Sequence, residues 1–288
     1  MKYSIKKNWV ASFEVILNNP VLLLPFVFIA FFETLTLELI YFSTRFPLSA
    51  IAAPIIRKFF GEAHLHYPAH LVIIPSIFYY VQIGIYITVG AFLTAISVNI
   101  FKNVKEKLPV RANAMVRNAA KRYGAFLLYG VIFMALMAAL QPFDKFILVK
   151  AVHLAQKIAP RISGQLISIG STIFLFLTTF LLQAIFIASI PFMVLEKKPV
   201  FKAIFSSMAL FIRNMFTVIG LIALPFLSYL PLVILKGVSR QLVDATFPEI
   251  VLAVTLAGSI ASIFVDSFML VCICRFITDR QKTQGKTP

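Results

Sequence analysis

Three polar residues lie inside long apolar stretches of the sequence: Glu33, Gln183 and Asp266. No Lys or Arg occurs in these stretches, so nothing there neutralises a carboxylate. Glu33 must therefore be protonated, hydrogen-bonded to Thr or Tyr, or exposed to water. Buried groups of this kind form proton sites or polar pathways; the alternative is that they are polar contacts between packed helices.

The spacing of these residues relates two of them to each other. Asp266 lies thirteen residues before Asp279, and Gln183 lies thirteen residues before Glu196. The same count back from Glu106 reaches a leucine, so two of three comparable positions are polar. Two of three units therefore place a polar residue at matching depth, and Glu33, Gln183 and Asp266 are the candidate intramembrane site, although polar contacts between packed helices are the interpretation that the sequence favours.

A second group of candidate ligands lies in one short segment, GEAHLHYPAH, which contains Glu62, His64, His66 and His70. Clusters of His and Glu can bind zinc or copper. The i,i+4 spacing of the last two histidines is interrupted by Pro68, which disrupts a helix. We therefore expect histidines at a membrane interface and no metal or cofactor.

Two further pairs have simple interpretations. Glu38 lies one heptad before Arg45, near the end of its apolar stretch, which predicts an ion pair reaching toward the membrane surface. Cys272 and Cys274 are two residues apart, which is neither a redox pair nor a metal pattern. On a helix they point about 200° apart and cannot bridge each other.

The motifs of common enzyme classes are missing from the sequence. It contains no His-Glu-x-x-His, no Gly-x-Ser-x-Gly, no phosphate-binding loop and no Gly-x-Gly-x-x-Gly. The segments between apolar stretches are too short to form a soluble catalytic domain. We therefore expect a protein that is not an enzyme and has no cofactor.

The elements that must position these residues are apolar helices. Of the 288 residues, 60% are hydrophobic and 13% are charged, and a membrane-spanning helix needs about 20 apolar residues. Six stretches qualify, which predicts an all-α, polytopic helical membrane protein: Pro20–Phe42, Leu71–Ile100, Tyr123–Leu140, Leu166–Val194, Asn214–Leu235 and Glu249–Cys274.

Amphipathic segments precede each odd-numbered span. The segment after Pro199 places apolar residues on one helical face and cations, including Lys202 and Arg213, on the other. The segment after Pro109 repeats the design with Arg117 and Lys121 on its polar face. Before the first span, apolar residues again line one face: Trp9, Phe13, Ile16 and Leu17. We expect interfacial helices whose cations interact with lipid headgroups.

These segments are parts of an internal repeat. Glu106 and Glu196 each begin a Glu-Lys-x-Pro-Val motif, and prolines punctuate the opposite loops at comparable spacing: Pro47, Pro142 and Pro231 at their starts, Pro68, Pro160 and Pro248 at their ends. Helix-like stretches such as DKFILVKAVHLAQKIAP lie between these prolines, so one unit contains an amphipathic helix, a span, an outer helical loop and a second span. Three such units, about 1–105, 106–195 and 196–288, form a single membrane domain with a predicted threefold repeat.

The distribution of positive charge predicts the orientation. Eighteen of the 27 Lys and Arg residues lie on the side that carries both termini, which places the termini in the cytoplasm. The net charge of +16 is explained by this bias, and no nucleic-acid partner is expected. The predicted location is the inner membrane, with lipids and a membrane protein as the expected partners.

One segment carries a resemblance to known proteins. From Ile190 to Leu224 the chain resembles bacterial six-helix membrane proteins similar to the membrane domain attached to some glycerophosphodiester phosphodiesterases. The shared pattern consists of Pro191, Glu196, Ala203, Ser206 or Ser207, and Arg213-Asn214. The resemblance implies six helices with interfacial helices in an inner membrane, and it implies no phosphodiesterase activity, because the catalytic barrel of such fusions is missing here.

Two functions fit these patterns. The first is a membrane subunit or scaffold that works with lipids or partner proteins in the cell envelope, which the interfacial helices favour. The second is a small proton-coupled transporter or permease, which the repeat and the polar residues Glu33, Gln183 and Asp266 favour.

Overall fold

Six long apolar helices dominate the computed structural model, which describes residues 4–158, 164–243, 249–283 and 285. Six helices in this part of the chain are long and apolar enough to cross a membrane, and no strand occurs in it. The predicted class, an all-α protein with six candidate membrane spans, is confirmed.

The elements follow the predicted order closely. Three short helices precede the odd-numbered spans, and the second and fourth spans are each built from more than one piece. In chain order the elements are α1 (Ile5–Asn18), η1 (Pro20–Leu22), α2 (Leu24–Tyr41), η2 (Phe42–Thr44), α3 (Ser49–Phe60), η3 (Glu62–Leu65), α4 (Ala69–Ile85), η4 (Tyr86–Gly90), α5 (Ala91–Lys105), α6 (Ala112–Ala120), α7 (Tyr123–Ile158), α8 (Gly164–Phe186), α9 (Ser189–Leu195), α10 (Val200–Arg213), α11 (Met215–Val243) and α12 (Ile250–Thr283).

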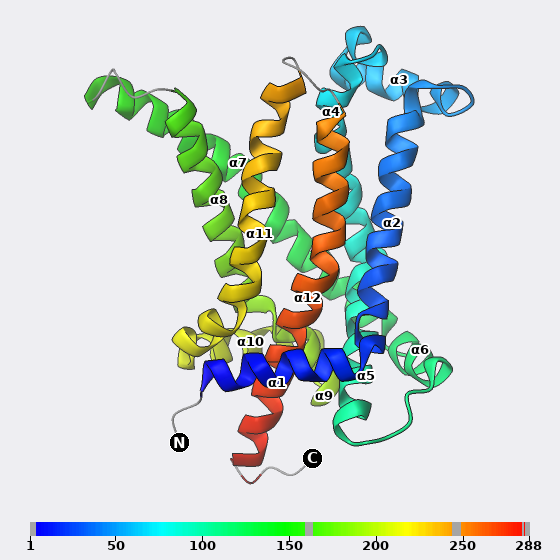
Figure 1. Ribbon diagram of the computed structural model, residues 1–288, viewed down its shortest axis with the longest axis vertical. Helices are drawn as coiled ribbons and strands as arrows, with labels where there is room; N and C mark the ends of the chain where they lie inside the picture. The colour runs from blue at the N-terminus through cyan, green and yellow to red at the C-terminus, as the bar shows by residue number, and fades with distance from the viewer. Residues whose placement is uncertain (1–3, 159–163, 244–248, 284, 286–288) are drawn as a thin grey trace.

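The spans pack as a closed ring, with both termini at the same end (Figure 1). Helix α2 packs on α4, α5 on α7, α7 on α8, α8 on α11 and α11 on α12, and α12 returns to α2. Helix α12 also contacts α4 and α5, so its buried faces are directed into the bundle. This ring brings residues of the first and last spans next to each other.

Helices α1 and α10 lie across the end of the bundle that carries the termini (Figure 1). In α10 small and aliphatic residues such as Ala203 and Ser207 are buried, while Phe201 and Phe205 are exposed. In α1 the packed residues are Asn8, Ser12 and Ile16, and the apolar Phe13 and Leu17 are exposed. The predicted apolar face of α1 is therefore divided: Ile16 and the partly buried Trp9 pack on the bundle, and Phe13 and Leu17 are exposed.

Side chains of these helices satisfy carbonyl groups that the spans leave free. Pro225 lies inside α11 and has no N–H, so the carbonyl of Leu221 loses its usual helical donor. The indole Nε1–H of Trp9 donates to this oxygen at 3.1 Å. Ser207 donates to the carbonyl of Ile185 at 2.6 Å, beside the break between α8 and α9. Helices α1 and α10 are thus hydrogen-bonded into the bundle.

The repeated sequence motifs adopt matching backbone conformations. Lys107 and Lys197, the second residues of the two Glu-Lys-x-Pro-Val motifs, have left-handed φ values of 55° and 54°. Asn19 and Asn214, which end α1 and α10, each donate a side-chain amide to the carbonyl four residues earlier, at 3.0 and 3.1 Å. Lys107 and Lys197 follow the second and fourth spans, and Asn19 and Asn214 precede the first and fifth spans. Each kind of corner therefore occurs twice with the same local geometry.

Two predicted loop boundaries are wrong. Pro142 and Pro231 were expected to open outer loops, but they lie inside α7 and α11, which continue to Ile158 and Val243. Neighbouring helices can compensate for the missing proline N–H in a membrane helix, so proline marks a helix end there less reliably than in water. Pro160 and Pro248, predicted to close these loops, lie outside the described residues.

Candidate functional site

Glu33 of α2 is partly buried and has a polar partner on the neighbouring helix α4. The side-chain amide of Gln82 donates a hydrogen bond of 2.9 Å to Oε1 of Glu33. An amide N–H is a suitable partner for the ionised form of a carboxyl group, since it stabilises the negative charge. The sequence predicted a Thr or Tyr partner for Glu33; the partner in the structure is a glutamine.

Asp266 of α12 lies within electrostatic range of Glu33, although 233 positions separate them in the chain. The side chains of Tyr86 and Tyr229 also interact electrostatically with Asp266. The carboxyl group of Asp266 makes no hydrogen bond to any of the described residues. The ring closure of α2 on α12 therefore assembles a carboxyl pair, Glu33 and Asp266, with tyrosines around it.

The second span changes its helical winding next to this pair. Residues Tyr86–Gly90 form a π-helical turn between α4 and α5. A turn of this kind widens the helix and shifts the direction of the side chains around it, and such turns are frequent at functional sites. Gly130 of α7 lies so close that an added Cβ would be 3.0 Å from the Cα of Ile87, so the two backbones are in close contact.

Tyr129 of α7 connects this turn to the fourth span. Its hydroxyl group donates to the carbonyl of Phe186 at 3.3 Å, and its side chain interacts with Tyr86 and Ser189. Phe186 is the last residue of α8, and Ser189 is the first residue of α9. The polar centre therefore extends from the carboxyl pair through two tyrosines to the break in the fourth span.

Gln183 lies in α8, as the sequence predicted, but no recorded contact joins it to Glu33 or Asp266. Its side-chain oxygen is buried and has no hydrogen-bond partner among the described residues. Sequence reasoning missed Gln82, although a glutamine in an apolar stretch is the same signal that identified Gln183. The tyrosines could not be identified, because the π-helical turn that places Tyr86 has no recognisable sequence pattern.

The chemistry available to the carboxyl pair is proton binding. Two carboxylates in an apolar environment repel each other, which favours binding of a proton at one of them. Glu33 accepts a hydrogen bond from the amide of Gln82, whereas the Asp266 carboxyl has no hydrogen bond among the described residues. The tyrosine hydroxyls can donate to whichever carboxyl becomes ionised.

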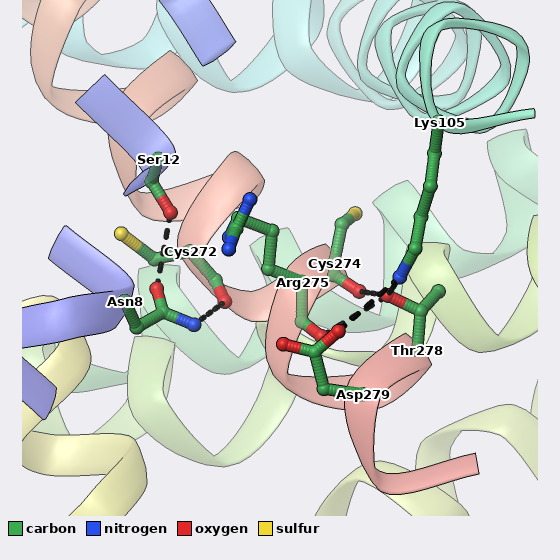
Figure 2. A network of polar contacts seen from close by, with 8 residues as sticks. All are labelled: Asn8, Ser12, Lys105, Cys272, Cys274, Arg275, Thr278 and Asp279. Atoms are coloured by element: carbon green, nitrogen blue, oxygen red, sulfur yellow. Dashed lines mark hydrogen bonds and ion pairs between the residues drawn. The ribbon is translucent and has the colours of Figure 1, made fainter. Parts of the chain in front are cut away.

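A second polar network lies at the end of the bundle near the termini (Figure 2). The ammonium group of Lys105 contacts Thr278 and forms an ion pair of 3.4 Å with Asp279. Asn8 donates to the carbonyl of Cys272 at 3.4 Å and accepts from the hydroxyl of Ser12 at 3.0 Å (Figure 2). These contacts fasten α1 and α5 to α12, so their role is structural.

The four cations that the sequence assigned to lipid headgroups are all exposed: Lys202, Arg213, Arg117 and Lys121. A neighbouring arginine has a different role. The guanidinium group of Arg122 donates to the carbonyl of Met193 and, at 2.7 Å, to that of Lys198. It connects the start of α7 to the corner between α9 and α10. The exposed cations remain available to solvent or headgroups.

The histidine segment does not assemble a metal site. Within the described part of the chain no group of three His, Cys, Asp or Glu side chains could hold a metal ion. Glu62 pairs with Arg57, and this hydrogen bond lowers the pKa of Glu62. Ring nitrogens of His64 and His70 are buried without a hydrogen-bond partner.

The predicted ion pair between Glu38 and Arg45 is wrong. No ion pair among the described residues joins them; the guanidinium group of Arg45 lies 5.9 Å from the ring centre of Tyr41 and 5.4 Å from that of Phe42. The rings of Tyr41 and Phe42 lie only four and three residues before Arg45 and attract its guanidinium group. This contact has a lower conformational cost than one with Glu38, which lies seven residues away. Glu38 itself is exposed on α2.

Comparisons of the chain with protein-family models, with curated proteins and with solved structures found no match.

Proposed function

We propose that this chain is a small proton-coupled permease of the inner membrane, and that it is not an enzyme. The observation that carries the proposal is the carboxyl pair: Glu33 of the first span and Asp266 of the last lie within electrostatic range, and no cation of the described spans neutralises them. An ionisable group costs about 2.5–3.5 kcal/mol at the centre of a membrane helix, so two of them need a function.

Polar contacts between helices explain the pair less well. Such contacts are usually made by Ser, Thr, Asn or Gln, which hydrogen-bond across an interface without carrying a charge. The partner of Glu33 is Gln82, and the carboxyl of Asp266 has no hydrogen bond among the described residues. An aspartate that only joined helices would be expected to use its oxygens as acceptors. A group that binds and releases a proton needs this freedom.

The arrangement of the spans around this site is part of the proposal. We propose that three units of one orientation surround the polar centre, with both termini in the cytoplasm and α1, α6 and α10 in the cytoplasmic interface. Support comes from the left-handed lysines of the two repeated motifs and from the closed ring of spans. The resemblance to the membrane domain of some glycerophosphodiester phosphodiesterases is part of this proposal and assigns no substrate.

Proton flux in proteoliposomes tests the proposal. A pH-sensitive dye inside the liposomes reports acidification of the interior after a membrane potential is imposed. Native protein is compared with Asp266→Asn and Glu33→Gln. Both variants are expected to fold with an unchanged melting temperature and to lose flux at least tenfold, because each removes one of the two carboxyl groups that can bind a proton. The matched control is Glu38→Gln, an exposed carboxyl on the same helix as Glu33, which is expected to keep native flux. Native flux in Asp266→Asn would contradict the proposal.

One set of observations favours a second function, a scaffold that works with lipids or a partner protein in the envelope. Helix α10 exposes Phe201, Phe205 and Ile212, and its cations Lys202 and Arg213 are exposed as well. Purification in lipid nanodiscs followed by native mass spectrometry distinguishes this function. A stoichiometric lipid or protein supports the scaffold, whereas a bare monomer together with proton flux supports the permease.

A further inference from the structure

Helix α3 (Ser49–Phe60) lies at the end of the bundle opposite the termini and is barely part of the core (Figure 1). Ile56 is its one buried residue. By contrast, Ile51 is 74% exposed, Ile55 53% and Phe59 70%. Because large apolar side chains are rarely left in water as a contiguous patch, this face needs a partner.

The three exposed residues form one stripe. They are four residues apart, and at about 100° per residue they fall within one side of the helix. Lys58 lies on the same side, with its ammonium group 5.6 Å from the centre of the Phe59 ring. Lys58 is exposed, so its stem can cover the apolar stripe while its charge reaches outward, as lysines do at a membrane surface.

The charges around the stripe suit an anionic surface. Glu62 is the nearest carboxylate in the sequence, and it is held by Arg57 through two hydrogen bonds. Arg45 and Lys58 both lie over aromatic rings instead of beside carboxylates. The region therefore presents positive charge beside apolar side chains, which is the combination that binds phospholipid headgroups and acyl chains.

Helix α3 packs against η2 (Phe42–Thr44), which directly follows α2 in the first span. Leu35, Leu39 and Phe42 of the first span are exposed by 42%, 49% and 40%, as expected of side chains in contact with acyl chains. Phe46, exposed by 89%, lies between this surface and α3. An apolar surface beside the end of a membrane span is already next to lipid. The lipid leaflet can therefore cover the stripe, and no additional molecule is required.

We infer that α3 is an interfacial helix that inserts the Ile51–Ile55–Phe59 face into the leaflet opposite the termini, with Lys58 reaching the lipid phosphates. The chain then contacts both leaflets with amphipathic helices, whereas the sequence predicted them on the side of the termini alone. The inference depends on membrane insertion of the spans and is independent of the proton site.

Fluorescence quenching in nanodiscs tests this placement. A nitrobenzoxadiazole probe is attached to Ile55→Cys or Phe59→Cys, and quenching by shallow doxyl-labelled lipids is compared with quenching by aqueous iodide. Ala53→Cys is the control on the opposite side of α3, and Leu39→Cys reports insertion of the first span. Both native cysteines are buried and fully inaccessible, and the unmodified chain measures their background labelling.

The expected result is that doxyl lipids quench the probes at residues 55 and 59 at least threefold more than the probe at 53, with protection from iodide. Iodide quenching of both stripe probes, together with doxyl quenching at 39, would overturn the inference and leave membrane insertion intact. Protection from both quenchers would also overturn it, because a protein would then cover the stripe. Failure of doxyl quenching at 39 would overturn membrane insertion itself.

Discussion

The hydrogen bond from Trp9 to the carbonyl of Leu221 makes a sharp prediction about how α1 is attached. Pro225 removes the helical donor for this carbonyl, and the indole N–H replaces it at 3.1 Å. Trp9→Phe keeps an aromatic ring but deletes the donor. A carbonyl left without a partner in an apolar environment costs about 1–3 kcal/mol, so the variant is expected to lose about this much stability.

A second substitution separates the hydrogen bond from the packing of the indole ring. Pro225→Ala restores a backbone N–H that can donate to Leu221, which makes the bond from Trp9 redundant. Trp9→Phe is therefore expected to cost about 1 kcal/mol less in the Pro225→Ala background, because the loss of packing is the same in both. Coupling energies of polar contacts in membrane proteins average about 0.6 kcal/mol and reach about 1.7, which brackets this value.

The assay is a double-mutant cycle on the free energy of unfolding, measured by steric trapping in bicelles. A coupling of about 1 kcal/mol corresponds to a fivefold change in the unfolding equilibrium. Hydrogen exchange of α1 amides gives a second measurement, since α1 is expected to exchange faster in Trp9→Phe alone. Equal costs of Trp9→Phe in both backgrounds would refute the explanation and would attribute the role of Trp9 to packing.

Three further predictions concern the corners and the opposite end of the bundle. Ser207→Ala leaves the Ile185 carbonyl without its donor and is expected to lower stability by about 1 kcal/mol in the same assay, whereas an unchanged stability would show that solvent replaces the serine. Lys107→Gly and Lys197→Gly relieve left-handed strain, so each is expected to raise the melting temperature by a similar amount; opposite signs would contradict their equivalence. The hydrogen bond from Arg57 lowers the pKa of Glu62, so this contact stabilises the fold above the unfolded pKa of about 4.3 and is lost as the pH falls through the lower folded pKa. The measurement is the protection factor of amides at the end of α3, corrected for the intrinsic pH dependence of exchange; a protection factor that does not fall over this range would contradict the prediction.

The spans could be predicted because membrane insertion depends mainly on apolar length. Tyr123–Leu140 was placed from composition alone and reappears as an apolar segment of α7 with the same bounds. The ends of helices were harder to predict, since Pro142 and Pro231 lie inside helices that continue past them. Proline punctuation describes water-exposed segments well, and in these segments it was misleading.

Sequence patterns also gave an incomplete picture of α1 and of the candidate site. Hydrophobicity identified an apolar stripe on α1, but the residues that pack on the bundle include Asn8 and Ser12. In lipid, the apolar side faces the acyl chains and the small polar side can pack on protein, which inverts the rule for soluble helices. For the site, sequence identified Glu33 and Asp266 but could not pair them, because their contact depends on how the ring closes.

Tyr129 relates the carboxyl pair to the break in the fourth span. A hydroxyl group has one proton to donate, and that of Tyr129 is given to the Phe186 carbonyl at the end of α8. Its neighbour Tyr86 interacts electrostatically with Asp266, so a change of charge on Asp266 alters which acceptor each tyrosine proton favours. Because that carbonyl lies where α8 ends and α9 begins, we expect a change of charge at the proposed proton site to affect the geometry of the fourth span.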